Sequence, residues 1–264
     1  MGLLFSCASM NNKGSMAEDY TARDLNEQLV MATVWMQASA EYRALCYQSF
    51  NLARMNLDTF LAGYKGSKPV AVIVDADETV IDNSAYEAYL IGQDFGYSSK
   101  TWDPWMAAGM AKAIPGAKAF LKYAESKKVE IFYITNRKTV GYDGTEKNLK
   151  ALGFPNVDKK HLLVRTGSSD KQERRDIVNE DYTVAFLMGD NLNDFESVFG
   201  GKSVGDRMWE TDLIKDHWGT KFIVLPNPTY GEWEGAVYKY NWGATPAEKD
   251  QMRKDHLEKW SYKP

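Results

Sequence analysis

The feature that most constrains the fold is an unbroken apolar run, Val70-Ala71-Val72-Ile73-Val74, in which β-branched residues dominate. A strand with one face in water would alternate apolar and polar residues. A continuous run therefore predicts a strand that is covered on both faces, as in a parallel sheet. Similar runs occupy residues 129–134, 183–188 and 222–225, and a weaker one occupies residues 161–164.

Helical patterns separate these predicted strands. They cover residues 117–126, 145–152 and 169–179, and a longer helical pattern precedes the first strand at about residues 21–63. Alternating strands and helices predict βαβ units. We therefore expect an α/β fold, a Rossmann-like doubly wound parallel sheet with an inserted cap and an added N-terminal helical segment. The cap is expected at residues 83–114, an aromatic and glycine-rich stretch that interrupts the alternation.

The first residues have a different character. Residues 1–19 are predicted to be a tether, and residues 20–264 the folded domain. Cys7 follows Leu4-Phe5-Ser6, which resembles the end of a bacterial lipoprotein signal, where the cysteine becomes lipidated. A short sequence left by cloning is the alternative. Nowhere does the chain contain the roughly 20 consecutive apolar residues that span a bilayer, so membrane contact is expected only through a lipid anchor.

The net charge and the cysteine content argue against nucleic acid binding and against a zinc site. The net charge of −4 argues against a nucleic acid polymer, because phosphate backbones bind basic surfaces. It allows a small anionic ligand at a locally cationic site. The chain has two cysteines, Cys7 and Cys46, and no Cys/His spacing typical of a zinc site.

Two carboxylates follow the first predicted strand. Asp75 and Asp77 are two residues apart just beyond its end, so both can face one crevice. Without a cation they would repel each other and the pKa of one would rise. A hard metal ion with oxygen ligands would remove that repulsion. Taken alone, the pair is more typical of a solvated turn, because acidic loops at strand ends are common.

Polar motifs also follow the next strands. Thr135-Asn136 ends the second strand and can donate hydrogen bonds to phosphate oxygens. Gly189-Asp190-Asn191-Leu192-Asn193-Asp194 ends a later strand, where Gly189 permits a close backbone approach. Lys171 is placed early in the helix before that strand. Each motif is ordinary by itself, but ligands of such sheets bind at the carboxyl ends of the strands. Their order and placement therefore predict one active site.

Together these motifs resemble the haloacid dehalogenase-like superfamily. Val74-Asp75-Ala76-Asp77-Glu78-Thr79-Val80-Ile81-Asp82-Asn83 is similar to the first signature of the class C nonspecific acid phosphatases, the bacterial surface lipoprotein type. Gly189-Asp190-Asn191-Leu192-Asn193-Asp194-Phe195 is similar to the last, and the resemblance extends from about residue 25 to the end of the chain. Ala76 and Ile81 stand where the family usually has larger aliphatics or leucine, apolar changes that leave the chemistry intact.

The resemblance implies roles for the acidic residues. Asp75 would attack phosphorus and form an aspartyl-phosphate, while Asp77 would protonate the leaving oxygen and then deprotonate water. Mg²⁺ would be bound by Asp75, Asp190 and the backbone carbonyl of Asp77. It would neutralise the repulsion between the nucleophile and the phosphate.

The same resemblance implies how phosphate and substrate bind. Thr135, Asn136 and Lys171 would contact the remaining phosphate oxygens, and Asp194 would orient Lys171 or a metal-bound water. Trp102 and Tyr230 resemble a pair of rings that clamps a flat group such as a nucleobase, because stacking tolerates any ring. Packing in the core or at a dimer contact is the alternative for these two rings.

The expected function is that of an acid phosphatase for small phosphomonoesters, among them nucleoside monophosphates and aromatic phosphates. A surface lipoprotein that only binds a small ligand is the alternative from another class, and a phosphotransferase is the alternative within the superfamily. The intact Asp75 and Asp77 argue against a mere binder. The enzyme is expected to be lipid-anchored at the bacterial outer membrane or cell surface, facing the periplasm or the exterior. A monomer and a homodimer both stay open.

Overall fold

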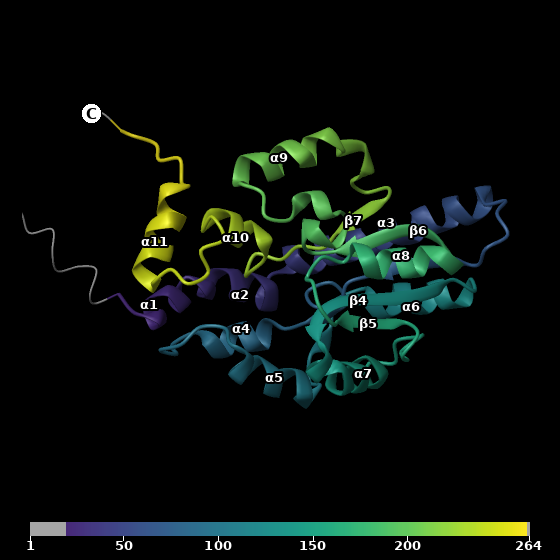
Figure 1. The fold of residues 1–264 in the computed structure, drawn as a ribbon, viewed down its shortest axis with the longest axis horizontal. Helices are drawn as coiled ribbons and strands as arrows, with labels where there is room; N and C mark the ends of the chain where they lie inside the picture. Colours follow the sequence, from purple (N-terminus) through teal and green to yellow (C-terminus); the bar gives the residue numbers. More distant parts are fainter. Residues whose placement is uncertain (1–19, 263–264) are drawn as a thin grey trace, which may run out of the picture.

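A computed structural model describes residues 20–262 and places a parallel sheet at the centre of the molecule (Figure 1). The sheet has five strands in the order β5-β4-β1-β6-β7, and all four neighbouring pairs are parallel. The strands are β1 (Val70–Val74), β4 (Glu130–Lys138), β5 (Leu162–Arg165), β6 (Thr183–Gly189) and β7 (Phe222–Val224). The apolar run that opened the sequence analysis forms the central strand, and the α/β prediction is confirmed.

Helices surround the sheet. They are α1 (Ala22–Glu27), α2 (Leu29–Ala38), α3 (Ala40–Gly63), α4 (Ser84–Leu90), α5 (Ser99–Ala108), α6 (Ala117–Ser126), α7 (Tyr142–Ala151), α8 (Gln172–Asp181), α9 (Val204–Leu213), α10 (Glu232–Val237) and α11 (Pro246–Asp255). A short antiparallel pair, β2 (Ile81–Asp82) and β3 (Lys112–Ala113), completes the regular structure used below. The predicted N-terminal helical segment is thus three consecutive helices, α1 to α3.

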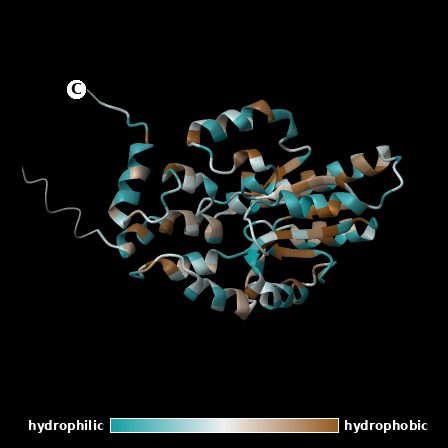
Figure 2. Cartoon of the chain, in the orientation of Figure 1, coloured by the Kyte–Doolittle hydropathy of each residue, from teal (hydrophilic) through white to brown (hydrophobic). Residues whose placement is uncertain are grey.

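Two hydrophobic clusters cover the two faces of the sheet. Val72 and Val74 of β1 belong to the larger cluster, together with buried residues of α3, α6 and α7. Ala71 and Ile73 belong to the smaller cluster, which includes Val178 of α8. Successive strand residues point to opposite faces, so both sets are apolar and the strand has no polar face. Figure 2 shows this as hydrophobic colour along the strands, with hydrophilic residues on the outer sides of the helices.

The segment expected to be a cap leaves and rejoins the sheet at one place. Ile81 of β2 pairs with Ala113 of β3, and Asp82 pairs with Lys112, so the start and the end of the segment lie side by side. Between them, α4 packs against α2 and α5 packs against α7. The segment therefore lies next to the carboxyl end of β1, where the sequence places the acidic pair.

The first and last helices of the described chain pack together. Helix α1 packs against α11, and both lie at one end of the molecule in Figure 1. Asp250 of α11 accepts hydrogen bonds from Tyr20 and Gln28, at 3.2 and 2.7 Å. Within residues 20–262, no helix is long and apolar enough to cross a membrane. The predicted tether at residues 1–19, with the lipidation site Cys7, lies outside the described residues.

A buried carboxyl group lies where α4 approaches α10. Glu87 of α4 is only 6% exposed, and Glu234 of α10 is near enough to act on its charge. Burial, together with the negative charge of Glu234, raises the pKa of Glu87 to about 7, above the usual 4.5. The folded protein therefore binds one more proton than the unfolded chain between these two values, and its stability falls as the pH rises through that window.

We expect Glu87→Gln to stabilise the protein at pH 8 by about 1–3 kcal/mol, because the amide has no charge to bury. At pH 4, where the Glu87 carboxyl is mostly protonated in both states, the gain should nearly vanish. Thermal unfolding at both pH values checks this, with the exposed Glu27→Gln of α1 as the control. The same gain at pH 4 and pH 8 would contradict the prediction.

Candidate active site

Asp75 lies directly after β1, at the middle of the carboxyl edge of the sheet. Its side chain is buried, and its backbone N–H donates a hydrogen bond of 2.9 Å to the Met188 carbonyl of β6. The neighbouring strand thus fixes the backbone that carries the carboxylate. The sequence prediction placed Asp75 at this position, at the point where ligands bind to such sheets.

Lys171 contacts two of the predicted aspartates. Its ammonium group is buried, forms an ion pair with Asp75, and lies 2.7 Å from Asp194 Oδ1. Burial alone would lower the pKa of Lys171, but the two carboxylates outweigh that effect and raise it, so the group stays charged. The sequence analysis put Lys171 inside a helix; instead it is the residue before α8, which begins at Gln172. That position turns its side chain into the site.

Three carboxylates gather around this lysine. Oxygens of Asp75, Asp190 and Asp194 lie within 4.8 Å of one another. Asp190 accepts hydrogen bonds from Thr79 Oγ1 at 3.1 Å and Asn227 Nδ2 at 2.9 Å. Burial, only partly offset by Lys171, raises the pKa of Asp75 to about 7, and burial and the two other carboxylates raise that of Asp190 well above its usual value. A second cation beside Lys171 would favour the ionised form of all three.

The donor set fits a hard divalent metal ion. All the donors are carboxylate oxygens, which Mg²⁺ and Ca²⁺ prefer, and neither thiolate nor imidazole belongs to the cluster. The sequence prediction named Asp75, Asp190 and the backbone carbonyl of Asp77 as ligands and put Asp194 outside them; the carboxylate cluster contains Asp75 and Asp190 and, in addition, Asp194. Gly189 makes this approach possible, because a Cβ there would lie 2.4 Å from Asp194 Oδ2.

Asp77 lies in a second group, tied to the expected cap. Arg137 donates to it from Nε at 2.9 Å, with Nη2 at 2.7 Å, and Asn83 Nδ2 donates at 2.7 Å. Thr135 Oγ1 lies 3.4 Å from the same carboxylate. Asn83 Oδ1 in turn accepts hydrogen bonds from Arg137 and from the Trp105 indole, at 3.1 and 2.8 Å. The Asp77 carboxylate is thus fixed by donors from β4 and from the segment after β2.

Strand geometry separates the two predicted phosphate ligands on β4. Thr135 and Arg137 face the same side, and Asn136 between them faces the other. Asn136 is exposed, and its Oδ1 accepts a hydrogen bond of 2.8 Å from Arg174 of α8. Arg174 is buried, and its other acceptors are the carbonyls of Thr135 and Asp170, at 2.6 and 3.2 Å. Arg174 forms no ion pair within residues 20–262, and none of its three hydrogen-bond acceptors is a carboxylate.

The two predicted clamp rings contact different residues of the site. Trp102 of α5 is half-buried, packs edge-on against Tyr86 at 4.9 Å between ring centroids, and has the Arg137 guanidinium 5.4 Å from its own centroid. The half-buried Tyr230 donates a hydrogen bond from its hydroxyl to the Glu78 carboxylate. Trp102 and Tyr230 make no ring contact with each other in the part of the chain described.

Sequence reasoning missed four polar residues of the site. Glu78 and Asn83 belong to the quoted signature and Arg137 follows Thr135-Asn136, yet none was given a role. The sequence offered a signal for Arg137. It stands two residues after Thr135 in the same strand, so its side chain points to the same face as Thr135 and toward Asp77. Arg174 stands three residues after Lys171, within the same turn of helix, which is also visible in the sequence.

Comparison with known proteins agrees with this geometry. Residues 4–233 match the family described as HAD superfamily, subfamily IIIB (acid phosphatase). The structure is similar to the class C acid phosphatase from Bacillus anthracis, with 43% identity, a TM-score of 0.86, and coverage of 90% of this chain and 99% of that one. The tungstate-bound structure of the Bacillus anthracis protein gives the same values.

These matches decide between the enzyme and the ligand-binding lipoprotein that the sequence analysis had left open. An acidic cluster with a buried lysine at the carboxyl edge of the sheet is what a phosphomonoesterase of this type requires. The chain therefore belongs to the acid phosphatase family of the haloacid dehalogenase-like superfamily, subfamily IIIB, and hydrolyses phosphomonoesters.

Proposed function

We propose that this acid phosphatase hydrolyses small phosphomonoesters, including nucleoside monophosphates and aryl phosphates, through an aspartyl-phosphate on Asp75. The observation that carries the proposal is the buried ammonium of Lys171 between Asp75 and Asp194. It favours the ionised form of the Asp75 carboxyl, and it offers a cation to the phosphate oxygens as charge develops there. Positioning and charge stabilisation are the main demands of phosphoryl transfer.

The proposed reaction has two steps. An oxygen of Asp75 attacks phosphorus, and the bond from phosphorus to the ester oxygen breaks. The leaving oxygen keeps the electron pair and takes a proton from the Asp77 carboxyl. A water molecule then attacks the aspartyl-phosphate and gives its proton to Asp77, so that phosphate leaves and Asp75 is restored. Arg137 and Asn83 keep Asp77 oriented for both transfers.

We further propose that the divalent ion is Mg²⁺, held by Asp75, Asp190 and the backbone carbonyl of Asp77. When bound, it would neutralise the repulsion between carboxylates and phosphate. The hydrogen bonds from Thr79 and Asn227 support Asp190 as a metal ligand, because they orient its carboxylate within the cluster of three aspartates. Thr135, Asn136 and Lys171 are proposed to bind the remaining phosphate oxygens, and Asp194 to orient Lys171.

Substrate choice and cellular location complete the proposal. Trp102 and Tyr230 would flank the flat part of the leaving group, with the Tyr230 hydroxyl anchored on Glu78. Lipid attachment at Cys7 would place the enzyme at the bacterial outer membrane or cell surface, facing the periplasm or the exterior. The support for that location is the Leu4-Phe5-Ser6-Cys7 sequence, and a small-molecule phosphomonoester is the only partner the chemistry requires.

Two substitutions separate the nucleophile from the acid. We expect Asp75→Asn to abolish turnover of every substrate, because an amide does not form the aspartyl-phosphate. Asp77→Asn should lower the rate by about 10²–10⁴ on an alkyl phosphate, whose leaving oxygen needs a proton. It should lose much less on p-nitrophenyl phosphate, whose leaving group is stable as an anion.

Phosphate release from both substrates checks this, with the exposed Asp181→Asn as the control. Equal losses on the two substrates in Asp77→Asn would contradict its role as the acid. Turnover by Asp75→Asn would contradict the assigned nucleophile.

Metal removal tests the cation. A chelator should inactivate the enzyme and Mg²⁺ should restore it, since an all-oxygen donor set favours a hard ion. Asp190→Asn should raise the Mg²⁺ concentration needed for half-maximal activity by about tenfold or more, because one anionic ligand is lost. Asp181→Asn should leave that concentration unchanged. Full activity in excess chelator would exclude the proposed metal.

The ring clamp is tested by comparing substrates. Trp102→Ala or Tyr230→Ala should weaken kcat/KM for a nucleoside monophosphate by about 1–3 kcal/mol per lost stack. A small aliphatic phosphate should be hydrolysed as well as by the parent. Tyr230→Phe keeps the ring and removes only the hydroxyl that contacts Glu78, so it should retain the nucleotide preference. Parallel losses on both substrates would make the two rings structural.

A further inference from the structure

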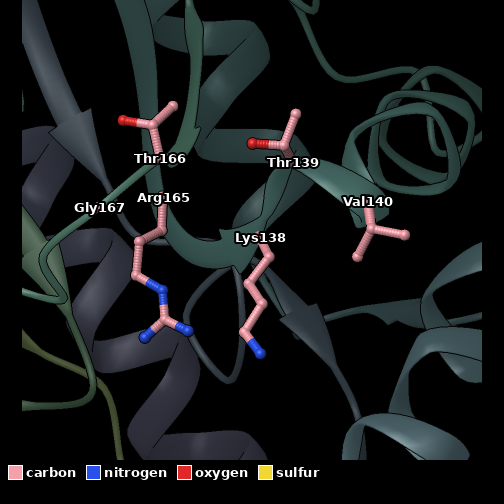
Figure 3. A pocket seen from close by; sticks show the side chains of 6 residues that line it. All are labelled: Lys138, Thr139, Val140, Arg165, Thr166 and Gly167. Carbon is pink, nitrogen blue, oxygen red and sulfur yellow. The ribbon is translucent and has the colours of Figure 1, made fainter.

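Two cations stand side by side beyond the proposed phosphate site. Lys138 ends β4 and Arg165 ends β5, and the two residues are paired in the register of the sheet. Both therefore lie at the carboxyl edge that carries Asp75. Figure 3 shows the two side chains extending in the same direction, with their nitrogen-bearing ends toward the same space, while Thr139 and Thr166 point away from them.

These cations line a groove at the carboxyl edge of the sheet. The groove has a volume of about 380 Å³ and is lined by Lys138, Thr139, Val140, Arg165, Thr166 and Gly167. A smaller hollow shares Lys138 and Arg165 with it and also includes Asn136, Trp102 and Tyr97. The smaller hollow thus joins a proposed phosphate ligand, Asn136, and a proposed ring contact, Trp102, to the two cations of the groove.

The charge of the pair is not compensated within residues 20–262. Neither Lys138 nor Arg165 forms an ion pair there, and the hydrogen bond from Lys138 goes to the neutral Ser99 hydroxyl at 3.4 Å. Asp103 also borders the smaller hollow without pairing with either cation. Two like charges this close favour an anion between them.

Arg174 extends the positive charge inward. It is buried beside Thr135 and Asn136, and its hydrogen bonds go to carbonyl and amide oxygens. Burial lowers the pKa of Arg174, and the positive charge of Arg165 lowers it further, while Asp75 acts in the opposite direction. Arg165 is therefore close enough to act on Arg174, which places a third positive charge beside Thr135 and Asn136.

We propose that Lys138 and Arg165 form a subsite for a second phosphate carried by the leaving group, so that the enzyme prefers bisphosphates, such as nucleoside 3′,5′-bisphosphates, over monophosphates. This inference rests on the proposed function, because it places the reacting phosphate at Asp75 and the ring at Trp102. The forked guanidinium of Arg165 suits two phosphate oxygens, and the ammonium of Lys138 adds a point charge beside it.

The test compares adenosine 5′-monophosphate with adenosine 3′,5′-bisphosphate by the initial rate of phosphate release. Lys138→Met and Arg165→Gln should each lower kcat/KM for the bisphosphate by about tenfold, as expected for one lost charge-assisted contact. Both variants should leave kcat/KM for the monophosphate within about twofold, and high salt should erase the preference of the parent. Lys118→Met, an exposed lysine on α6, is the matched control and should change neither substrate.

A binding measurement keeps the two proposals distinguishable. Calorimetric titration of the Asp75→Asn protein with the same two nucleotides should show tighter binding of the bisphosphate, and adding Lys138→Met should remove that difference. If the parent hydrolyses neither nucleotide while the binding preference persists, the proposed function fails and the subsite stands. If both nucleotides bind equally, or if the variants lose both substrates alike, the subsite is overturned.

Discussion

Lys171 brings one positive charge into the carboxylate cluster of Asp75, Asp190 and Asp194, and the arrangement of this edge of the sheet depends on it. Asp75 and Asp194 share its ammonium group, and both carboxylates are buried. A buried charge without a partner costs several kcal/mol, so the lysine and the two aspartates stabilise one another and none is dispensable by itself. The position of Lys171 just before α8 fixes this helix relative to β1 and β6, because the ion pair tolerates little displacement.

A second set of charges repeats this arrangement around Asp77. Arg137 and Asn83 hold its carboxylate from β4 and from the residue before α4. The two acidic side chains of the first signature therefore belong to different networks, one tied to the sheet and α8, the other tied to the segment expected to be a cap. This separation suits the proposed roles, with Asp75 as the nucleophile and Asp77 as the group that exchanges protons, although only Ala76 lies between them and they share one loop.

Much of this architecture could be predicted from the sequence because the relevant signals are local. The run at residues 70–74 is apolar on both faces, and the central strand was predicted with its observed bounds. Helix α6 was also predicted with its observed bounds. Local sequence signals did not predict the end of a strand where a contact with a distant part of the chain determines it. Strand β4 continues to Lys138, past its apolar run, because its last residue pairs with Arg165 of β5.

The residues of the candidate site also divide into those that local sequence motifs predicted and those that only the fold brings together. The motif positions of Asp75 and Asp190 indicated one edge of the sheet, and the structure brings them together with Lys171. The partners of Asp77 were not predictable, because Arg137 is 60 residues away from it in the chain and its role follows only from the folded register. Asn136 illustrates a limit of motif reading, since a strand directs neighbouring side chains to opposite faces.

The contact between α1 and α11 has a consequence for handling the enzyme. Hydrogen bonds join Tyr20 and Gln28 to Asp250, and Arg253 also donates to Gln28 at 2.7 Å. A pull applied at either end of the described chain would load this helix pair before it loaded the sheet. Attachment to a solid support through either end would therefore put little force on the edge of the sheet that carries Asp75. The two ends could also be joined by a linker, and the chain could be cut in an exposed loop far from Asp75 to give a circularly permuted enzyme.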